Sequence, residues 1–292
     1  MSHPSELGLG LLCIHAHPDD ESISTGGVLA RYADEGIRTA VVTCTGGERG
    51  EVVGPGMDPD DIGSRLGQVR EAELSRALGI LAAGPPRFLG YVDSGMMGTD
   101  GNDDEASFWR ASFDDAVGRM VAQIRALRPD VAVTYEPFGG YGHPDHIQSH
   151  RVACAAIEAA DVAALYPQAG PAWRVRKVYF QAIPKSRITW INSELARRGL
   201  PSPFGVIDRA EELPFGIADE RITTVVDVGA WYERKVAAIR AHASQLGPDS
   251  FFLNFPDELL SEAFSQEWFI RHRSDVDVPE VEDDLFAGLR GV

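Results

Sequence analysis

The chain has 292 residues, of which 44% are hydrophobic and 24% charged, so it carries enough apolar side chains to bury a large core and is not intrinsically disordered. Its 27 Lys and Arg against 44 Asp and Glu give a net charge of −17, which repels nucleic-acid phosphates and anionic lipid. No stretch reaches the ~20 uncharged apolar residues of a membrane helix, and residues 1–10 contain no basic segment leading into an apolar one, so we expect a cytoplasmic protein.

Residues 1–165 alternate short apolar runs with amphipathic stretches. This pattern is typical of a parallel sheet covered by helices on both faces. We expect strands at 9–16, 38–43, 87–91 and 131–135, and helices at 66–81, 113–127 and from 144 to about 160. The first helix is expected to be capped by Ser24 or Thr25 and to end at Gly36. The sequence therefore predicts an α/β catalytic domain with a Rossmann-like, doubly wound, mostly parallel sheet.

Residues 166–292 have a less regular pattern. Strands are expected at 175–181 and 221–228, and helices at 186–198 and 231–245, with a Pro/Gly-rich loop after residue 198. We expect this half to complete the sheet and to add a smaller part that covers the substrate. The acidic run at 280–284 is interpreted as a solvated surface stretch.

A first polar cluster follows the first predicted strand and reads His15-Ala16-His17-Pro18-Asp19-Asp20-Glu21. Taken singly, each residue has an ordinary role, as a helix-capping aspartate or a loop histidine. Together, the carboxylates would repel one another strongly unless a cation neutralised them. The cluster therefore indicates a cation site.

A second cluster, Gly139-Gly140-Tyr141-Gly142-His143-Pro144-Asp145-His146, follows the fourth predicted strand. The carboxyl ends of parallel strands meet at one edge of a sheet, where such folds bind their ligands. An open set of histidine and aspartate ligands completed by water suits catalytic zinc, with Fe²⁺ or another divalent ion as the alternative. Spacing does not decide between His143 and His146 as the ligand, and the glycines are equally explained by a tight turn.

At these two clusters the chain resembles the LmbE-like, or PIG-L, family of zinc-dependent N-deacetylases. The resemblance rests on His-Pro-Asp-Asp at 17–20 and Pro-Asp-His at 144–146, in that order. It continues through Thr-Cys-Thr-Gly-Gly-Glu at 43–48, Arg70 and Asp-Ser-Gly-Met at 93–96, and covers about the first 160 residues well and the rest more loosely.

The resemblance implies one Zn²⁺ per chain and a role for each matching residue. The implied metal ligands are His17, Asp20 and His146. The implied general base is Asp19, and the residues implied to lie beside the scissile carbonyl are Tyr141 and His143. The residues implied to line the sugar and inositol pocket are Arg70 and Asp93, each of which has an alternative role, as an ion-pair partner or a turn cap respectively.

Within the family the chain resembles the mycothiol branch, whose members hydrolyse amides on a glucosaminyl-inositol. Two markers, Gly142 and Ser24 near the substrate, favour the N-acetylglucosaminyl-inositol deacetylase over the mycothiol S-conjugate amidase. Three later segments, at 165–167, 240–245 and 283–286, resemble the amidase at least as much. A relative acting on another N-acyl amino sugar or secondary metabolite is a third possibility.

These parts give a hypothesis for the reaction. Zinc activates a water, Asp19 takes its proton, and the Tyr141 hydroxyl stabilises the tetrahedral intermediate. The departing amine is protonated by Asp19 or by His143, which Asp145 would orient.

The sequence disfavours two other classes of function. A dinucleotide-dependent oxidoreductase is disfavoured because the His-Pro-Asp-Asp turn stands where Gly-x-Gly-x-x-Gly would bind a pyrophosphate. A non-enzymatic metal- or sugar-binding module is ranked last. We expect a small-molecule glycosyl-inositol or a similar amino sugar as the partner, with no nucleic acid and no membrane, and make no prediction of the oligomeric state.

Overall fold

The computed structural model describes residues 8–200, 202, 213–247, 250, 253 and 255–291. Residues 1–7 and most of the loop predicted after residue 198 lie outside this range. Within it, seven strands form one sheet in the order β3-β2-β1-β4-β5-β7-β6. The strands are β1 (Gly10–His15), β2 (Arg38–Thr45), β3 (Arg87–Tyr91), β4 (Val131–Tyr135), β5 (Lys177–Ala182), β6 (Thr224–Asp227) and β7 (Gln266–Ser274).

Strands β1 to β5 are mutually parallel, and β7 runs antiparallel to both β5 and β6. This confirms the prediction of a mostly parallel α/β sheet. The chain winds outward from β1 through β2 to β3 and then returns to the other side of β1 with β4. The order therefore reverses between β1 and β4, which places the ligand crevice of this fold at the carboxyl ends of these two strands.

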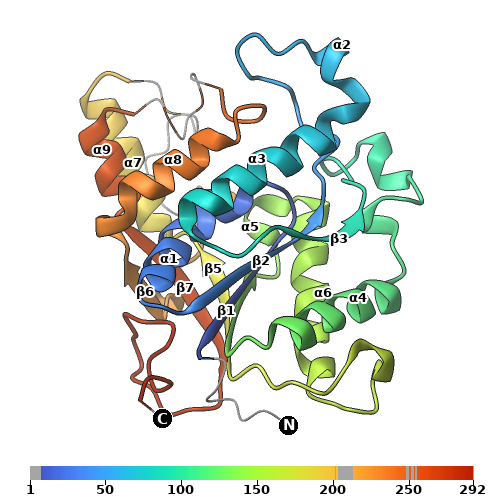
Figure 1. Cartoon of the computed structure of the whole chain (residues 1–292). Helices are drawn as coiled ribbons and strands as arrows, with labels where there is room; N and C mark the ends of the chain where they lie inside the picture. The colour runs from blue at the N-terminus through green and yellow to red at the C-terminus, as the bar shows by residue number, and fades with distance from the viewer. Residues whose placement is uncertain are drawn as a thin grey trace.

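Helices cover both faces of the sheet (Figure 1). The helices on one face are α1 (Asp20–Asp34), α3 (Leu66–Leu81) and α8 (Tyr232–Ala241), and those on the other are α4 (Phe113–Leu127) and α6 (Pro144–Ala160). The remaining α-helices are α2 (Pro59–Ile62), α5 (Gly139–Gly142), α7 (Lys185–Arg197) and α9 (Asp257–Ala263). Among the described helices, none combines the length and the apolar character that a membrane span requires.

The central strand β1 shows why this arrangement is stable. All six of its residues are buried, with Leu11 and Cys13 in one apolar cluster and Leu12 and Ile14 in the other. A strand that is apolar on both faces requires cover on both sides, which the two helical layers provide.

The start of α1 differs from the prediction. The helix begins at Asp20, so Ser24 and Thr25 lie inside it, and the predicted cap is wrong. The carbonyl of Asp19 already accepts from the backbone N–H groups of Ser22 and Ile23, which begins the helix directly from the turn. The predicted end is confirmed, because Gly36 follows the helix with φ 78°.

The C-terminal half contributes β5, β6 and β7 to the same sheet. The division of the chain at residue 165 and a C-terminal part that covers the substrate stay predictions. The prediction that 280–284 is a solvated stretch is wrong for Glu282, which is buried. Its carboxylate accepts from Lys177 Nζ at 2.5 Å and from the Tyr179 hydroxyl at 2.9 Å. The buried ammonium of Lys177 on β5 explains why this acidic residue lies inside.

Candidate active site

The turn between β1 and α1 carries the first polar cluster, and its own carboxylates hold it together. Asp20 Oδ2 accepts from the His17 backbone N–H at 2.9 Å and from the Tyr135 hydroxyl at 2.7 Å. Asp19 adopts φ 120°, a positive value that side chains disfavour, and its backbone N–H donates to Glu21 Oε2 at 3.0 Å. Backbone strain of this kind costs about 1–3 kcal/mol and persists only where the surroundings enforce it.

The second turn, between β4 and α6, depends on glycine. Gly139, Gly140 and Gly142 have φ values of 70°, 78° and 88°, which glycine adopts without strain. A Cβ atom at Gly139 would lie 2.6 Å from His146 Cβ. Gly139 therefore allows the loop to pass close over His146.

The structure distinguishes the two histidines that spacing left open. His143 Nδ1 accepts from the Asp145 backbone N–H at 3.1 Å and so caps α6. His146 Nδ1 lies 3.0 Å from the Gly139 carbonyl oxygen, which is only an acceptor. The proton of a neutral His146 therefore sits on Nδ1, and Nε2 carries the free lone pair.

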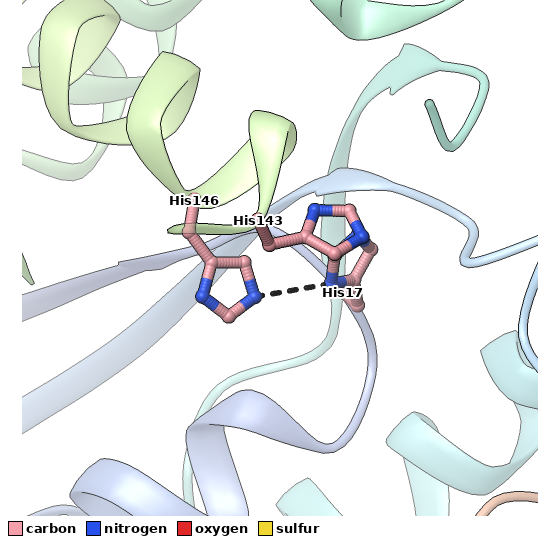
Figure 2. A group of neighbouring side chains, drawn as sticks. All are labelled: His17, His143 and His146. Carbon is pink, nitrogen blue, oxygen red and sulfur yellow. Dashed lines mark hydrogen bonds between the residues drawn. The ribbon is translucent and has the colours of Figure 1, made fainter. Parts of the chain in front are cut away.

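The same reasoning applies to His17. Its Nε2 faces the Asp145 carboxylate at 3.2 Å, so in the neutral imidazole Nε2 carries the proton and Nδ1 the lone pair. Nδ1 of His17 lies 3.3 Å from Nε2 of His146, the contact drawn in Figure 2. Asp20 Oδ2 lies 3.5 Å from His17 Nδ1 and 3.4 Å from His146 Nε2, which completes a triangle. Three electron-donating atoms at such distances repel one another unless a cation or a proton lies among them, so these residues fit a metal ion.

A second group of side chains adjoins this triangle. Asp93 Oδ1 lies 3.7 Å from His17 Nε2, and the rings of His17 and His143 are 4.5 Å apart. Together with Asp145, they place four potential ligand atoms within 4.8 Å of one another. Asp93 thus lies beside the centre, and its carboxylate also accepts from the Gly95 backbone N–H at 2.7 Å.

Asp145 does not orient His143 through its side chain, contrary to the prediction. The carboxylate is fully buried and turned toward His17, and it also accepts from the backbone N–H and the hydroxyl of Ser94. Only its backbone N–H contacts His143. A carboxylate that holds one ring nitrogen of a histidine fixes the tautomer and the ring orientation, and Asp145 holds Nε2 of His17 in this way.

Arg70 is buried, and its guanidinium donates hydrogen bonds to other groups of the protein. It donates to the carbonyl oxygens of Gly47 at 2.8 Å and Pro18 at 2.6 Å, and to Asp19 Oδ2 at 3.2 Å. These bonds fix both the turn and the Asp19 side chain. Ser24 is partly exposed on α1, one turn beyond Asp20. For both residues a direct contact with substrate stays a prediction.

Tyr141 lies at the mouth of the site and is 53% exposed. Its ring centroid is 5.0 Å from that of His146 and 6.2 Å from that of His143. Partial burial and the charge of Asp20 raise the pKa of Tyr141 above its ordinary value, so the phenol stays protonated and able to donate.

The titratable groups of the site have their pKa values shifted in different directions. Burial raises the pKa of Asp19 to about 6, with Asp20 adding to the effect and Arg70 opposing it. Burial, together with the charges of His17 and His146, lowers the pKa of His143 to about 3. Burial lowers the pKa of His17, but Asp93, Asp145 and Asp20 outweigh it and raise this pKa well above the ordinary value. Near neutral pH, His143 is therefore uncharged, and the metal-free His17 holds a proton.

Four residues that support the site were given no individual role from the sequence. Glu21 and Ser94 stood within its motifs, whereas Tyr135 and His242 were missed. Tyr135 is the last residue of β4, and its hydroxyl bridges Asp20 and the backbone N–H of Ala16. A tyrosine at the end of a buried strand, directly before the second cluster, was the signal available for it. Nothing local to His242 marks its role, because its contact with Glu21 spans 221 positions of sequence.

Residues 12–157 match the model of the PIG-L family, described as GlcNAc-PI de-N-acetylase. A 1D-myo-inositol 2-acetamido-2-deoxy-α-D-glucopyranoside deacetylase of Geodermatophilus obscurus is 44% identical over 288 residues, covering 96% of this chain and 98% of the relative. A protein of Catenulispora acidiphila named as the same deacetylase, number 1, is 41% identical over 96% of this chain and 89% of the relative.

Among solved structures, the N,N'-diacetylchitobiose deacetylase of Pyrococcus horikoshii superposes with a TM-score of 0.62. The match covers 92% of this chain and 85% of that protein at 18% sequence identity. A likeness at this identity shows a shared fold, in agreement with the strand order and helix layers described above.

Proposed function

The chain belongs to the PIG-L family of de-N-acetylases, and from that premise we propose that it removes the acetyl group from an N-acetylglucosaminyl-inositol in mycothiol biosynthesis, as a zinc-dependent hydrolase. The name shared by its relatives supports this substrate. The observation that carries the proposal is the triangle of lone-pair atoms on His17, Asp20 and His146.

Zinc fits this triangle. Its sides of 3.3, 3.4 and 3.5 Å agree with the edges of about 3.3–3.6 Å in a tetrahedral zinc site whose ligands lie at about 2.0–2.2 Å. Three protein ligands leave the remaining position open, which is characteristic of catalytic rather than structural zinc. When bound, zinc supplies Lewis-acid polarisation and lowers the pKa of a coordinated water towards ~7.

In this proposal Asp19 is the general base. Its pKa of about 6 leaves it mostly ionised at neutral pH, ready to take the proton of the attacking water. Arg70 holds one carboxylate oxygen at 3.2 Å, and Glu21 holds the backbone N–H, so the group is fixed at both ends. This fixation orients the carboxylate before substrate arrives.

His143 and Tyr141 act as neutral hydrogen-bond donors to the carbonyl oxygen of the amide. Because His143 Nδ1 accepts from the Asp145 backbone, its proton sits on Nε2. With a pKa of about 3, His143 is a poor store for the proton that the leaving amine needs. We therefore assign the return of that proton to Asp19 and stabilisation of the oxyanion to His143 and Tyr141.

Mycothiol S-conjugate amidase activity is the second candidate. The amidase-like segment 240–245 contacts the loop beside the site. Ser244 O accepts from the Val53 backbone N–H at 2.9 Å, and Gln245 Nε2 donates to Glu51 O at 3.0 Å. We propose that through these contacts the segment affects which acyl group the site accepts.

One experiment compares these candidates directly. Metal content is measured on the purified protein, and amine release is followed from N-acetylglucosaminyl-inositol and from a mycothiol S-conjugate in parallel. Faster release from the acetyl sugar with about one zinc per chain supports the proposal. Faster release from the conjugate supports the amidase, and a zinc-loaded protein that cleaves neither substrate contradicts both assignments.

A further inference from the structure

A buried chain of side chains connects the C-terminal half of the protein to the backbone of Asp19. His242 follows the end of α8 and is completely buried. Its Nε2 lies 2.8 Å from Glu21 Oε1 and 3.3 Å from the Ser22 hydroxyl. The other oxygen of Glu21 accepts from the Asp19 backbone N–H at 3.0 Å. The Glu21 carboxylate alone thus links the imidazole of His242 to the backbone N–H of the proposed base, Asp19.

The imidazole is well placed to hold Glu21. The carbonyl of His242 accepts from the backbone N–H groups of Gln245 and Leu246, which fixes the residue in a tight turn. Its Nδ1 is buried without a hydrogen-bond partner in the described part of the chain, so Nε2 makes the contact and is the nitrogen that donates. Glu21 is likewise fully buried, and His242 and Ser22 together set the orientation of its carboxylate.

Asp19 needs this support because of its backbone. At φ 120° and ψ −33° it would relax toward a common conformation if nothing held its N–H. Relaxation would rotate the peptide on which the carboxylate stands and move that carboxylate away from Arg70. Because small displacements of a reacting group cost large factors in rate, the support has a kinetic consequence.

We propose that His242 is a positioning residue, which holds Glu21 so that Glu21 holds the Asp19 backbone in the geometry of the working base. The expected effect of His242 on the reaction rate rests on the proposed function. Its expected effect on the Asp19 backbone is independent of that function.

The test uses His242→Leu, which removes the donor, and His242→Gln, whose terminal amide reaches about as far as Nε2. We expect His242→Leu to lower kcat about 10–100-fold with KM within about twofold, and His242→Gln to recover most of kcat. Zinc content should stay at that of the wild type, because the three proposed ligands are untouched. His242→Asn, which is too short to reach Glu21, replaces the Leu variant if that variant does not fold.

Lys235→Met is the matched control. Lys235 joins the same two helices through a second buried pair, with Nζ 2.6 Å from Glu267 Oε1, which in turn accepts from the Gly27 backbone N–H at 2.7 Å. This pair contacts neither Asp19 nor Glu21. Its loss should lower the melting temperature while kcat at 25 °C stays unchanged.

Amide hydrogen exchange at Asp19, measured by NMR on the metal-free protein, gives a readout independent of turnover. We expect faster exchange in His242→Leu, recovery in His242→Gln and no change in Lys235→Met. If His242→Leu lowers only the melting temperature, leaving kcat and Asp19 exchange as in the wild type, or if His242→Gln fails to restore them, the proposal is overturned. A wild type that does not cleave the acetyl sugar would instead refute the proposed function, while the exchange data would still decide the role of His242.

Discussion

Tyr135 offers a sharp test of how the proposed ligand Asp20 is held. Its buried hydroxyl donates to Asp20 Oδ2 at 2.7 Å and accepts from the Ala16 backbone N–H at 2.9 Å. Tyr135→Phe removes both bonds and leaves the ring in place. Losing a partner that orients a metal ligand typically weakens metal binding about 10–100-fold, equivalent to about 1.4–2.7 kcal/mol.

The same substitution affects the metal-free protein. The Ala16 N–H is left without a partner in the buried turn, which costs about 1–3 kcal/mol of the free energy of unfolding. Zinc affinity is measured by competition with a chelator, and stability by urea unfolding of the metal-free protein.

Tyr179→Phe is the control that separates the two effects. Tyr179 is also buried and also donates to a carboxylate, Glu282 Oε2 at 2.9 Å, but on β5 and outside the site. It should lose a similar amount of stability and keep wild-type zinc affinity. Zinc affinity in Tyr135→Phe within about twofold of wild type, despite the lost stability, would refute the reasoning that Tyr135 holds a ligand.

Three further predictions concern the chemistry. Asp19→Asn should retain zinc but lower kcat about 10²–10⁴-fold, because the amide cannot accept the proton; a variant purified without zinc would make Asp19 a ligand instead. Tyr141→Phe should lower kcat about 10²–10³-fold with little change in KM, and a rise in KM at constant kcat would assign Tyr141 to binding only. In the metal-free protein burial lowers the pKa of His17, but the neighbouring carboxylates of Asp93, Asp145 and Asp20 outweigh it and raise this pKa. Zinc that binds His17 must therefore displace a proton. Zinc affinity should accordingly increase about tenfold per pH unit from pH 6 to 7. Chelator competition corrected for the chelator's own protonation checks this, and an affinity independent of pH would show that no proton is displaced.

Local sequence patterns were sufficient for the elements that are bounded by strong signals. Helix α4 is an example, because Ser112 caps its start, accepting from the Asp115 backbone N–H, and Pro129 follows its end. Strand β7 was missed because Arg271 and Arg273 interrupt its apolar character. Arg271 forms an ion pair with Glu282, and Arg273 forms one with Glu158. Both partners lie outside the strand, so the sequence of the strand gives no sign of them.

The types of residue in the candidate site and their place after two predicted strands could be read from the sequence. Two clusters at the carboxyl ends of separate parallel strands were expected to meet, and they do, because β1 and β4 are neighbours in the sheet. The choice between His143 and His146 depends on which backbone group each ring meets, the Asp145 N–H or the Gly139 carbonyl. The partner of the Asp145 carboxylate depends on a contact 128 positions away. Such details follow from tertiary packing and cannot be predicted from spacing.

The reversal of strand order between β1 and β4 has a consequence for folding. His17 and His146 are separated by 129 positions but lie in contact because their strands are neighbours in the sheet. A metal held by both would act as a reversible cross-link that closes a long loop, and it would favour the folded chain over the unfolded one. At a free zinc concentration about 1,000 times Kd, this linkage adds about 4.1 kcal/mol to the free energy of unfolding. Zinc supply would then govern how much of the protein stays folded as well as what fraction of it is active.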